Sequence, residues 1–269
     1  MALTSLQREV CRLLADQRKR SGESYIAGGI ALNELIGGHR ISRDIDLFHD
    51  TRDALAASWI SDRERLEVLG YQVEVILERP SLVEAIVRSV SDSVRMEWNQ
   101  DSAFRFFPLI EHDEFGLTLH PFDLATNKVL ALVGRAEARD WVDLILAAES
   151  IQPLGYLVWA ASGKDPGLSP TAIAEHASRS TRYSVDELRE LHFDGAAPDA
   201  SDLSRRWKRL LDSVRPVIDR LPAEHSGECV LGPEGLFRGS PDELQRALEE
   251  GQIAFHRGSI RGAFPQLAR

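Results

Sequence analysis

Hydrophobic residues recur along the first 150 residues with two different periods, which predict interleaved strands and helices. Short apolar or alternating runs typical of strands lie at residues 24–27, 43–49, 71–77, 83–90, 94–100 and 116–120. The spacing of three and four residues that marks an amphipathic helix is found at residues 4–20, 30–38, 51–70, 121–135 and 140–149. Thr4 or Ser5, Thr51 and Asp140 are the expected N-caps of three of these helices.

The pattern changes near residue 150. From there the apolar runs have helical spacing, at residues 156–163, 170–180, 185–191, 202–221 and 241–251. Segments rich in Gly, Pro, Asp and Ser separate several of them and predict turns. We therefore expect an α+β fold, with an N-terminal α+β domain over residues 1–150 and a helical C-terminal domain over residues 151–269.

Composition excludes some classes of protein. The chain has 269 residues, of which 43% are hydrophobic and 28% charged, so it can bury a sizeable core. The formal net charge of -10 argues against a protein that coats nucleic acid non-specifically, although a local basic groove is compatible with it. Cys11 and Cys229 are far apart and indicate neither a disulfide framework nor a zinc site. With neither a signal peptide nor a run of roughly 18 apolar residues, the expected location is cytoplasmic, with no membrane partner.

Two aspartates are the first candidates for chemistry. Asp44 and Asp46 lie two residues apart in an expected strand, so their side chains project from the same face. Two carboxylates this close repel each other, and a divalent cation removes that penalty. Mg²⁺ suits such a site because it takes oxygen ligands and is often completed by substrate phosphates. Mn²⁺ could replace it. Alone, however, the D-x-D pattern more often marks a solvated strand face.

Two glycines precede the aspartates. Gly28 and Gly29 follow the strand at residues 24–27 and allow a backbone conformation that other residues resist. Their N–H groups, with the start of the next helix, would form an anion-binding nest. A pair of glycines is usually only a turn. The order of strand, glycine pair, helix and D-x-D strand is far more specific, and it indicates phosphoryl or nucleotidyl transfer.

Residues 28–48 carry the first of two motifs by which this chain resembles a known family. The segment is similar to nucleotidyltransferases of the DNA polymerase beta superfamily, and more closely to the AbiEii/AbiGii toxin family, which includes the MenT toxins. The shared pattern is GG-x-A-L followed by R-x-S-x-D-I-D, supplied here by Gly28, Gly29, Ala31, Leu32, Arg40, Ser42, Asp44, Ile45 and Asp46. The resemblance covers about residues 20–150. It implies a nucleotidyltransferase fold with a mixed sheet flanked by helices, and it places Arg40 and Ser42 beside the nucleotide.

A second family motif lies downstream. It consists of a lysine, an alanine, an arginine and then R-D-x-x-D-L, here Lys128, Ala131, Arg135, Arg139, Asp140, Asp143 and Leu144. The resemblance implies that Lys128 meets the triphosphate, and Arg135 could reach phosphates or pair with the aspartates. One aspartate of the motif is implied to matter for activity. Asp140 is favoured over Asp143, and an Arg–Asp brace between two helices is an equally weighted alternative for Asp140.

The superfamily also uses a third carboxylate on a neighbouring strand. Glu97 alternates with Met96 and Trp98, so it faces the site if those two side chains pack in the core. An exposed strand glutamate is the competing interpretation. Asp101 and Glu74 are weaker candidates.

These observations predict a Mg²⁺-dependent transferase that moves a nucleoside monophosphate from an NTP to an acceptor. The resemblance implies a toxin of a bacterial toxin–antitoxin or abortive-infection system, with a cognate antitoxin as partner and tRNA as the favoured acceptor. The basic stretch at residues 204–209 supports RNA contact only weakly, since a charge run is usually a solvated helix face. Two alternatives are a nucleotide-binding or partner-binding module with little transfer, and a transferase that acts on a protein or a small molecule.

Overall fold

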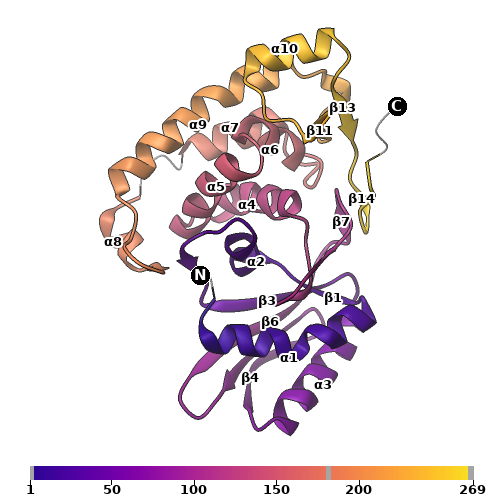
Figure 1. The fold of residues 1–269 in the computed structure, drawn as a ribbon, viewed down its shortest axis with the longest axis vertical. Helices are drawn as coiled ribbons and strands as arrows, with labels where there is room; N and C mark the ends of the chain where they lie inside the picture. Colours follow the sequence, from indigo (N-terminus) through magenta and orange to yellow (C-terminus); the bar gives the residue numbers. More distant parts are fainter. Residues whose placement is uncertain (1–2, 180–182, 266–269) are drawn as a thin grey trace. The chain divides into compact units, whose positions relative to one another are not determined.

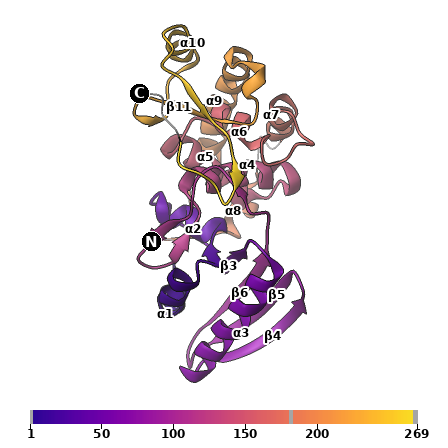
Figure 2. The same cartoon turned by 90° about the vertical axis from the view of Figure 1, so that its right-hand side faces the viewer.

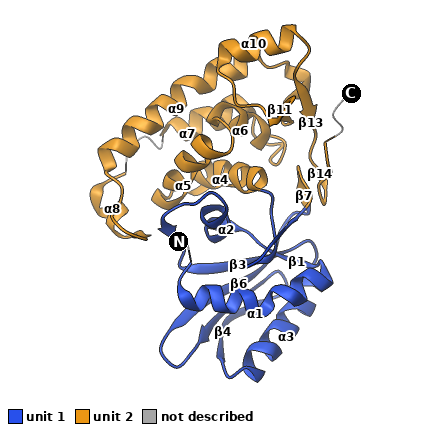
Figure 3. Ribbon diagram, viewed as in Figure 1, with its two compact units in different colours: residues 1–103, 109–120 blue, residues 104–108, 121–269 orange. Residues whose placement is uncertain are grey.

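The structure is a computed structural model that describes residues 3–179 and 183–265. It contains two compact units (Figure 3). Unit 1 comprises residues 1–103 and 109–120, and unit 2 comprises residues 104–108 and 121–269. The expected boundary at residue 150 thus lies inside unit 2, because the helices at residues 121–150 pack with the helices that follow them. The assignment of residues 1–150 to one nucleotidyltransferase domain stays a prediction.

Unit 1 is built on a mixed seven-stranded sheet with the strand order β4-β5-β6-β3-β1-β9-β8. Its strands β1, β3, β4 and β6 are labelled in Figure 1. Strand β3 runs parallel to β6, and β1 runs parallel to β9, while the other neighbours are antiparallel. The strands are β1 (Ser24–Ile26), β3 (Asp44–His49), β4 (Gln72–Arg79), β5 (Leu82–Arg88), β6 (Ser93–Gln100), β8 (Ile110–His112) and β9 (Gly116–Thr118), and β2 (Arg40–Ile41) lies outside the sheet. The helices are α1 (Ser5–Ser21), α2 (Gly28–Leu35) and α3 (Arg52–Val68).

Helices α1 and α3 lie side by side against one face of this sheet (Figure 2). Arg65 of α3 donates from Nε to the Leu13 carbonyl of α1 at 2.7 Å. Trp59 of α3 packs edge-on against Trp98 of β6, with ring centroids 4.8 Å apart. Every second residue of the central strands is buried on this face, as the alternation predicts. Thr4 and Thr51 are confirmed as the N-caps of α1 and α3.

Unit 2 is mainly helical. Its helices are α4 (Pro121–Arg135), α5 (Ala138–Ser150), α6 (Leu154–Ala161), α7 (Pro170–Arg179), α8 (Val185–Arg189), α9 (Ala200–Arg220), the 3₁₀ turn η1 (Ala223–His225) and α10 (Pro241–Glu249). It also contains β7 (Phe104–Arg105), β10 (His192–Phe193), β11 (Cys229–Gly232), β12 (Gly235–Leu236), β13 (Ala254–His256) and β14 (Ser259–Ile260). Strands β12, β11 and β13 form a small antiparallel sheet that the sequence pattern did not predict.

Two expected helix starts are wrong by a few residues. Helix α2 begins at Gly28 and not at residue 30, because the glycine pair itself forms the first turn. Helix α5 has Glu137 at its N-cap position, so Asp140 is not the cap. The Asp140 carboxylate binds Lys128 and Arg135 instead, which leaves it unavailable for the backbone N–H groups of its own helix.

No single helix in the described parts of the chain is long and apolar enough to cross a membrane. The pair α5 and α6 passes the length and composition test together, but it is bent by 112°. Both helices are largely buried against the rest of unit 2.

His49 at the end of β3 predicts a dependence of stability on pH. Burial lowers the pKa of His49 to about 4, even though its ring nitrogen Nδ1 lies 3.1 Å from the Asn99 carbonyl. In the unfolded chain the His49 ring is protonated near pH 6.5, whereas in the folded chain it is protonated only near pH 4. The free energy of unfolding therefore falls by about 3 kcal/mol as the pH drops through that window. We expect a His49→Gln variant to lose less stability between pH 6.5 and 4 than the wild type in urea unfolding. Equal slopes would show that His49 does not contribute.

Candidate active site

The two aspartates of β3 project from the sheet face opposite α1 and α3. Ile45 and Leu47 are buried on the helix-covered face, whereas Asp44 and Asp46 are half-buried on the other. The expected separation of the two sets of side chains is therefore observed. Phe48 lies on the same face as the aspartates and stacks on Tyr25 of β1, with ring centroids 6.2 Å apart.

The glycine pair lies directly against Asp46. Gly28 has a φ of +72°, a conformation that side-chain-bearing residues rarely adopt. A Cβ atom on Gly28 would overlap the Asp46 Oδ2 atom and lie 3.0 Å from its Cγ. The backbone N–H of Ala27 donates to the Asp46 carbonyl at 3.2 Å, which ties the start of α2 to β3. Glycine is thus required here because the carboxylate occupies the space of a side chain.

The N-terminus of α2 therefore lies beside a carboxylate-bearing strand. Its N-cap residue Ala27 supplies no side-chain hydrogen bond to the first turn. The first N–H groups of a helix have no partner within the helix, and the helix dipole adds positive charge there. This end of α2 can accept an anionic group.

Glu97 lies next to Asp46 on the same sheet face. The two residues are directly paired between the parallel strands β3 and β6, and Glu97 is in turn paired with Glu84 of β5. Met96 and Trp98 are fully buried on the opposite face, as the orientation of Glu97 requires. Paired residues of neighbouring strands have side chains about 5 Å apart. Three carboxylates thus form one row across the sheet.

Arg95 partly neutralises this row. Its Nη2 atom lies 2.7 Å from Glu84 Oε2, and its Nε atom lies 3.3 Å from Glu97 Oε1. Neither Glu84 nor Arg95 was among the predicted site residues. The alternation of β5, where Val83 and Ala85 are buried, places Glu84 on the site face, but only the strand register shows that it stands beside Glu97.

Arg40 and Ser42 lie in the segment that enters β3. Both are buried, at 5% and 8% exposed, and Arg40 belongs to the short strand β2. The Ser42 carbonyl accepts a hydrogen bond from the side chain of Gln7 at 2.7 Å. This contact anchors the segment to α1.

The residues of the second motif form a buried charge cluster in unit 2. Lys128 of α4 has its Nζ atom 2.8 Å from Asp140 Oδ1 and 3.1 Å from Asp143 Oδ2 of α5. Arg135 donates from Nε and Nη2 to the two oxygens of Asp140, at 2.6 and 2.9 Å. Both aspartate side chains are completely buried. The cluster braces α4 against α5, which is the structural alternative that the sequence left open for Asp140.

The same cluster shifts the titration of Asp140. Burial by itself raises the pKa of a carboxylic acid, but the hydrogen bond from Arg135 and the charge of Lys128 outweigh it and hold the pKa of Asp140 below its ordinary value. Asp140 is therefore ionised at neutral pH. The positive charge of Lys128 is compensated by two carboxylates within its own unit.

Asp44 and Asp46 are the candidate ligands for a divalent cation. Within residues 3–179 and 183–265, no three His, Cys, Asp or Glu side chains are grouped closely enough to form a complete metal site. Mg²⁺ commonly takes one or two carboxylates and completes its shell with water and substrate phosphates. Asp44 and Asp46 match that donor set, and Gly28 leaves the space that the Asp46 carboxylate fills. The residues present therefore fit a magnesium ion that binds together with a nucleotide.

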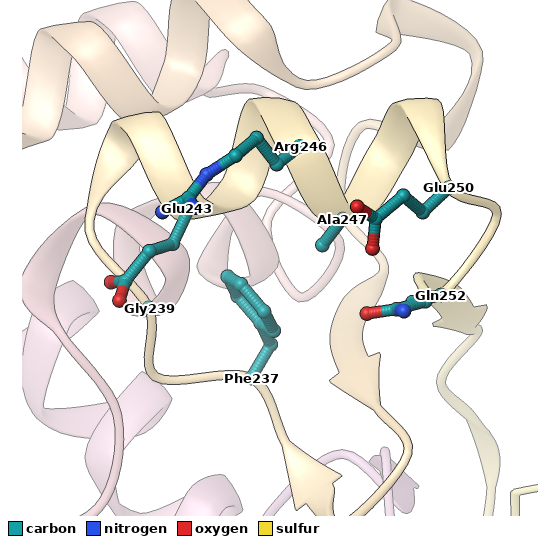
Figure 4. A pocket seen from close by; sticks show the side chains of 7 residues that line it. All are labelled: Phe237, Gly239, Glu243, Arg246, Ala247, Glu250 and Gln252. Carbon is teal, nitrogen blue, oxygen red and sulfur yellow. The ribbon is translucent and has the colours of Figure 1, made fainter.

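A hollow of about 310 Å³ lies beside α10 in unit 2 (Figure 4). Phe237 forms its base, and Glu243 and Glu250 lie at its two sides. The Phe237 ring packs edge-on against Tyr156, with centroids 5.7 Å apart. No predicted site residue lines this hollow, so it has no part in the candidate active site.

Comparison with known proteins supports the fold. No protein-family model matches the chain, and no curated protein matches it in sequence. Among solved structures, a candidate nucleotidyltransferase from H. pylori matches with a TM-score of 0.54 and 14% identity, over 81% of this chain and 96% of that one. The chain therefore has a nucleotidyltransferase fold, as the two motifs predict.

Two further structures show weaker similarity. The nucleotidyltransferase toxin MenT4 from Mycobacterium tuberculosis matches with a TM-score of 0.37 and 16% identity, over 78% of this chain and 92% of that one. The Megavirus polyadenylate synthase matches with a TM-score of 0.41 and 15% identity, over 54% of this chain and 31% of that one. Scores this low carry no argument about activity or substrate.

Proposed function

We propose that this protein is a Mg²⁺-dependent nucleotidyltransferase that transfers a nucleoside monophosphate from an NTP to an acceptor hydroxyl. The observation that supports this best is the contact between Gly28 and the Asp46 carboxylate. It brings a helix N-terminus that can hold phosphate next to a strand that can hold a cation. A site for the phosphates of an NTP and a site for its cation would thus lie on adjacent backbone segments.

The reaction forms one bond and breaks one. The acceptor oxygen attacks the α-phosphorus, the bond from that phosphorus to the bridging oxygen breaks, and pyrophosphate leaves. When bound, Mg²⁺ would neutralise charge on the triphosphate at Asp44 and Asp46. The N–H groups at Gly28 and Gly29 would hold phosphate oxygens, with Arg40 and Ser42 as further candidate contacts. Glu97 is the candidate that receives the acceptor proton, because it lies in register with Asp46.

For Lys128, Arg135 and Asp140 of unit 2, a role in the reaction is supported by the second motif alone. Lys128 is the candidate cation for the departing phosphates, with Arg135 as a second contact, and Asp140 would hold the ammonium group in place. The pairing of Lys128 with two buried carboxylates favours the alternative that this cluster is structural. That observation also supports the second candidate function, a nucleotide-binding module with little transfer.

The acceptor and the biological role rest on resemblance. A role as a toxin with a cognate antitoxin, and tRNA as acceptor, are proposals that the MenT-like motifs suggest. The basic stretch of α9 adds little support, because Trp207 is fully buried and Arg206 pairs with Glu149. A protein or small-molecule acceptor is equally compatible with the net charge of -10.

Labelled NTPs test the proposal directly. Purified protein would be incubated with each NTP, Mg²⁺ and total bacterial RNA, beside Asp46→Asn as the matched variant. We expect transfer by the wild type and a loss on the order of a hundredfold or more in the variant, because several kcal/mol of charge stabilisation depend on the metal. Label on tRNA-sized RNA would support the tRNA acceptor, and label on protein or a small molecule would replace it. Metal-dependent NTP binding without transfer would favour the binding module.

A further inference from the structure

Strand β4 is an edge of the sheet in unit 1. It stands at the end of the strand order and pairs with β5 on one side only, and no described strand pairs with its other side. With eight residues it is among the longest strands of the sheet. The backbone N–H and C=O groups on the outer side of an edge strand can pair with another extended chain.

Apolar side chains gather around this edge. Val75 and Ile76 of β4 are 36% and 51% exposed, and Ile60 of the adjacent helix α3 is 56% exposed. Val68 and Leu69, at the end of α3, are 85% and 48% exposed. These five make up more than half of the nine large apolar side chains exposed in the described residues. Single exposed apolar residues are ordinary on a protein surface, but their concentration on two elements that contact each other, α3 and β4, favours a binding surface.

A groove of about 440 Å³ lies between α3 and β4. Trp59 and Ile60 supply apolar lining from α3, and Glu78 supplies a carboxylate from β4. The direct pairing of Glu78 with the buried Val83 places Glu78 on the sheet face that α3 covers. The edge strand and the groove therefore form one continuous surface, which we call the α3/β4 surface.

The charge of the α3/β4 surface is negative. Arg63 lies over the Trp59 ring at 5.8 Å, pairs with Glu67 at 2.8 Å and also interacts electrostatically with Glu78. Glu64 and Glu78 also line the groove, and neither forms an ion pair with any described residue. The groove lining thus contains three glutamates and one arginine, and this negative balance favours a ligand with positive charge.

A second copy of the chain is a poor occupant for this edge. The net charge of -10 opposes self-association, and the glutamates of this groove would meet the same glutamates on a second copy. The irregular register between Val75 and Leu77 also bends the strand locally. Charges and bulges on an edge are devices that prevent pairing between identical chains. The like charges do not oppose a chain of opposite charge, and the irregular register is confined to Val75–Leu77.

We propose that the α3/β4 surface binds an extended segment of another protein that carries basic and apolar side chains two residues apart, so that both kinds lie on the strand face turned towards α3. The segment adds to the sheet as a strand antiparallel or parallel to β4. Its apolar side chains cover Ile60 and Val75, and its basic side chains meet Glu64 and Glu78. This surface is separate from Asp44, Asp46 and Glu97, so the inference is independent of the proposed transferase activity.

A peptide library tests this proposal on the full chain. Random ten-residue linear peptides would be displayed and selected for binding to the wild type. We expect enrichment of sequences that have Lys or Arg two residues from Val, Ile or Leu. The best synthetic peptide should bind at least tenfold more weakly to a Glu64→Lys/Glu78→Lys variant, and likewise to Ile60→Asp. Val185→Asp changes an equally exposed apolar residue in unit 2 and should bind as the wild type does.

Two further readouts separate strand addition from simple charge attraction. Binding should slow hydrogen exchange of the β4 amides, and peptides with N-methyl groups on alternate residues should lose affinity when these block the edge facing β4. Enrichment of acidic peptides, or binding that the α3/β4 variants leave unchanged, would overturn the proposal. So would sedimentation of the wild type as a dimer that Ile60→Asp dissociates, since the second copy would then be the occupant.

Discussion

A Gly28→Ala substitution is expected to abolish nucleotidyl transfer while leaving the protein folded. The new Cβ would occupy the position of Asp46 Oδ2. Because that atom is the end of a side chain that can rotate, the carboxylate would turn away and the backbone would remain. A displacement of about 1 Å in a catalytic group can cost on the order of a hundredfold in rate. We expect a loss of at least that size, together with weakened binding of Mg²⁺ or Mn²⁺ in the presence of NTP.

Gly37→Ala is the matched control for this prediction. Gly37 also has a positive φ, at +67°, but a Cβ there would meet nothing within 4 Å. Both substitutions force alanine into the left-handed region, at a cost of roughly 1–2 kcal/mol. Both variants should therefore lose similar stability in urea unfolding, and only Gly28→Ala should lose metal binding and transfer. Equal metal binding in the two variants would show that Asp46 does not act through its contact with Gly28.

Much of the site in unit 1 could be predicted because strand alternation is a local property. Ile45 and Leu47 define which face of β3 is buried, and this fixes the direction of Asp44 and Asp46 without knowledge of the neighbouring strands. The same reasoning applies to Glu97 on β6. What alternation cannot provide is the register between strands. Glu84 stands in the same row as Glu97 only because β5 and β6 pair as they do.

The charge cluster in unit 2 was harder to predict for a related reason. Lys128, Asp140 and Asp143 lie on two helices joined by a short turn, and helical spacing alone does not show which side chains meet across the turn. A helix cap was the simplest local role for Asp140. The carboxylate accepts three hydrogen bonds from Lys128 and Arg135 in place of a capping bond, so tertiary structure determines where it points. The small sheet of β11, β12 and β13 was missed because strands of two to four residues carry little periodicity.

The largest effect on stability is expected for Asp140→Ala. The substitution removes one carboxylate from Lys128 and both hydrogen bonds from Arg135, in a place where the aspartate side chain is completely buried. Removing one partner from a buried ion pair leaves an uncompensated charge and costs about 3–5 kcal/mol. Asp143 still contacts Lys128 at 3.1 Å, which places the expected loss towards the lower end of this range. The measurement is the free energy of urea unfolding at pH 7.

Asp219→Ala serves as the control, because Asp219 forms an ion pair of similar length on the exposed surface of α9. Arg215 lies 2.8 Å from it, and both side chains are more than half exposed. Exposed pairs of this kind contribute about 0.5 kcal/mol. A loss for Asp140→Ala no greater than for Asp219→Ala would contradict the structural role of the cluster. If such a stable variant had also lost transfer, the role of Asp140 would be chemical.

The pH dependence of the same variant separates charge pairing from packing. The pKa of Asp140 is lowered in the folded protein, so its ionised form stabilises the fold at every pH above the ordinary carboxyl value of about 3.9. That contribution is lost as the pH falls below 3.9 through the folded-state pKa. The difference in stability between the wild type and Asp140→Ala should therefore be constant from pH 7 to about pH 5 and shrink at lower pH. A difference in stability that persists unchanged in acid would mean that Asp140 stabilises unit 2 by filling space. The charge of the Asp140 carboxylate would then not be needed to hold Lys128.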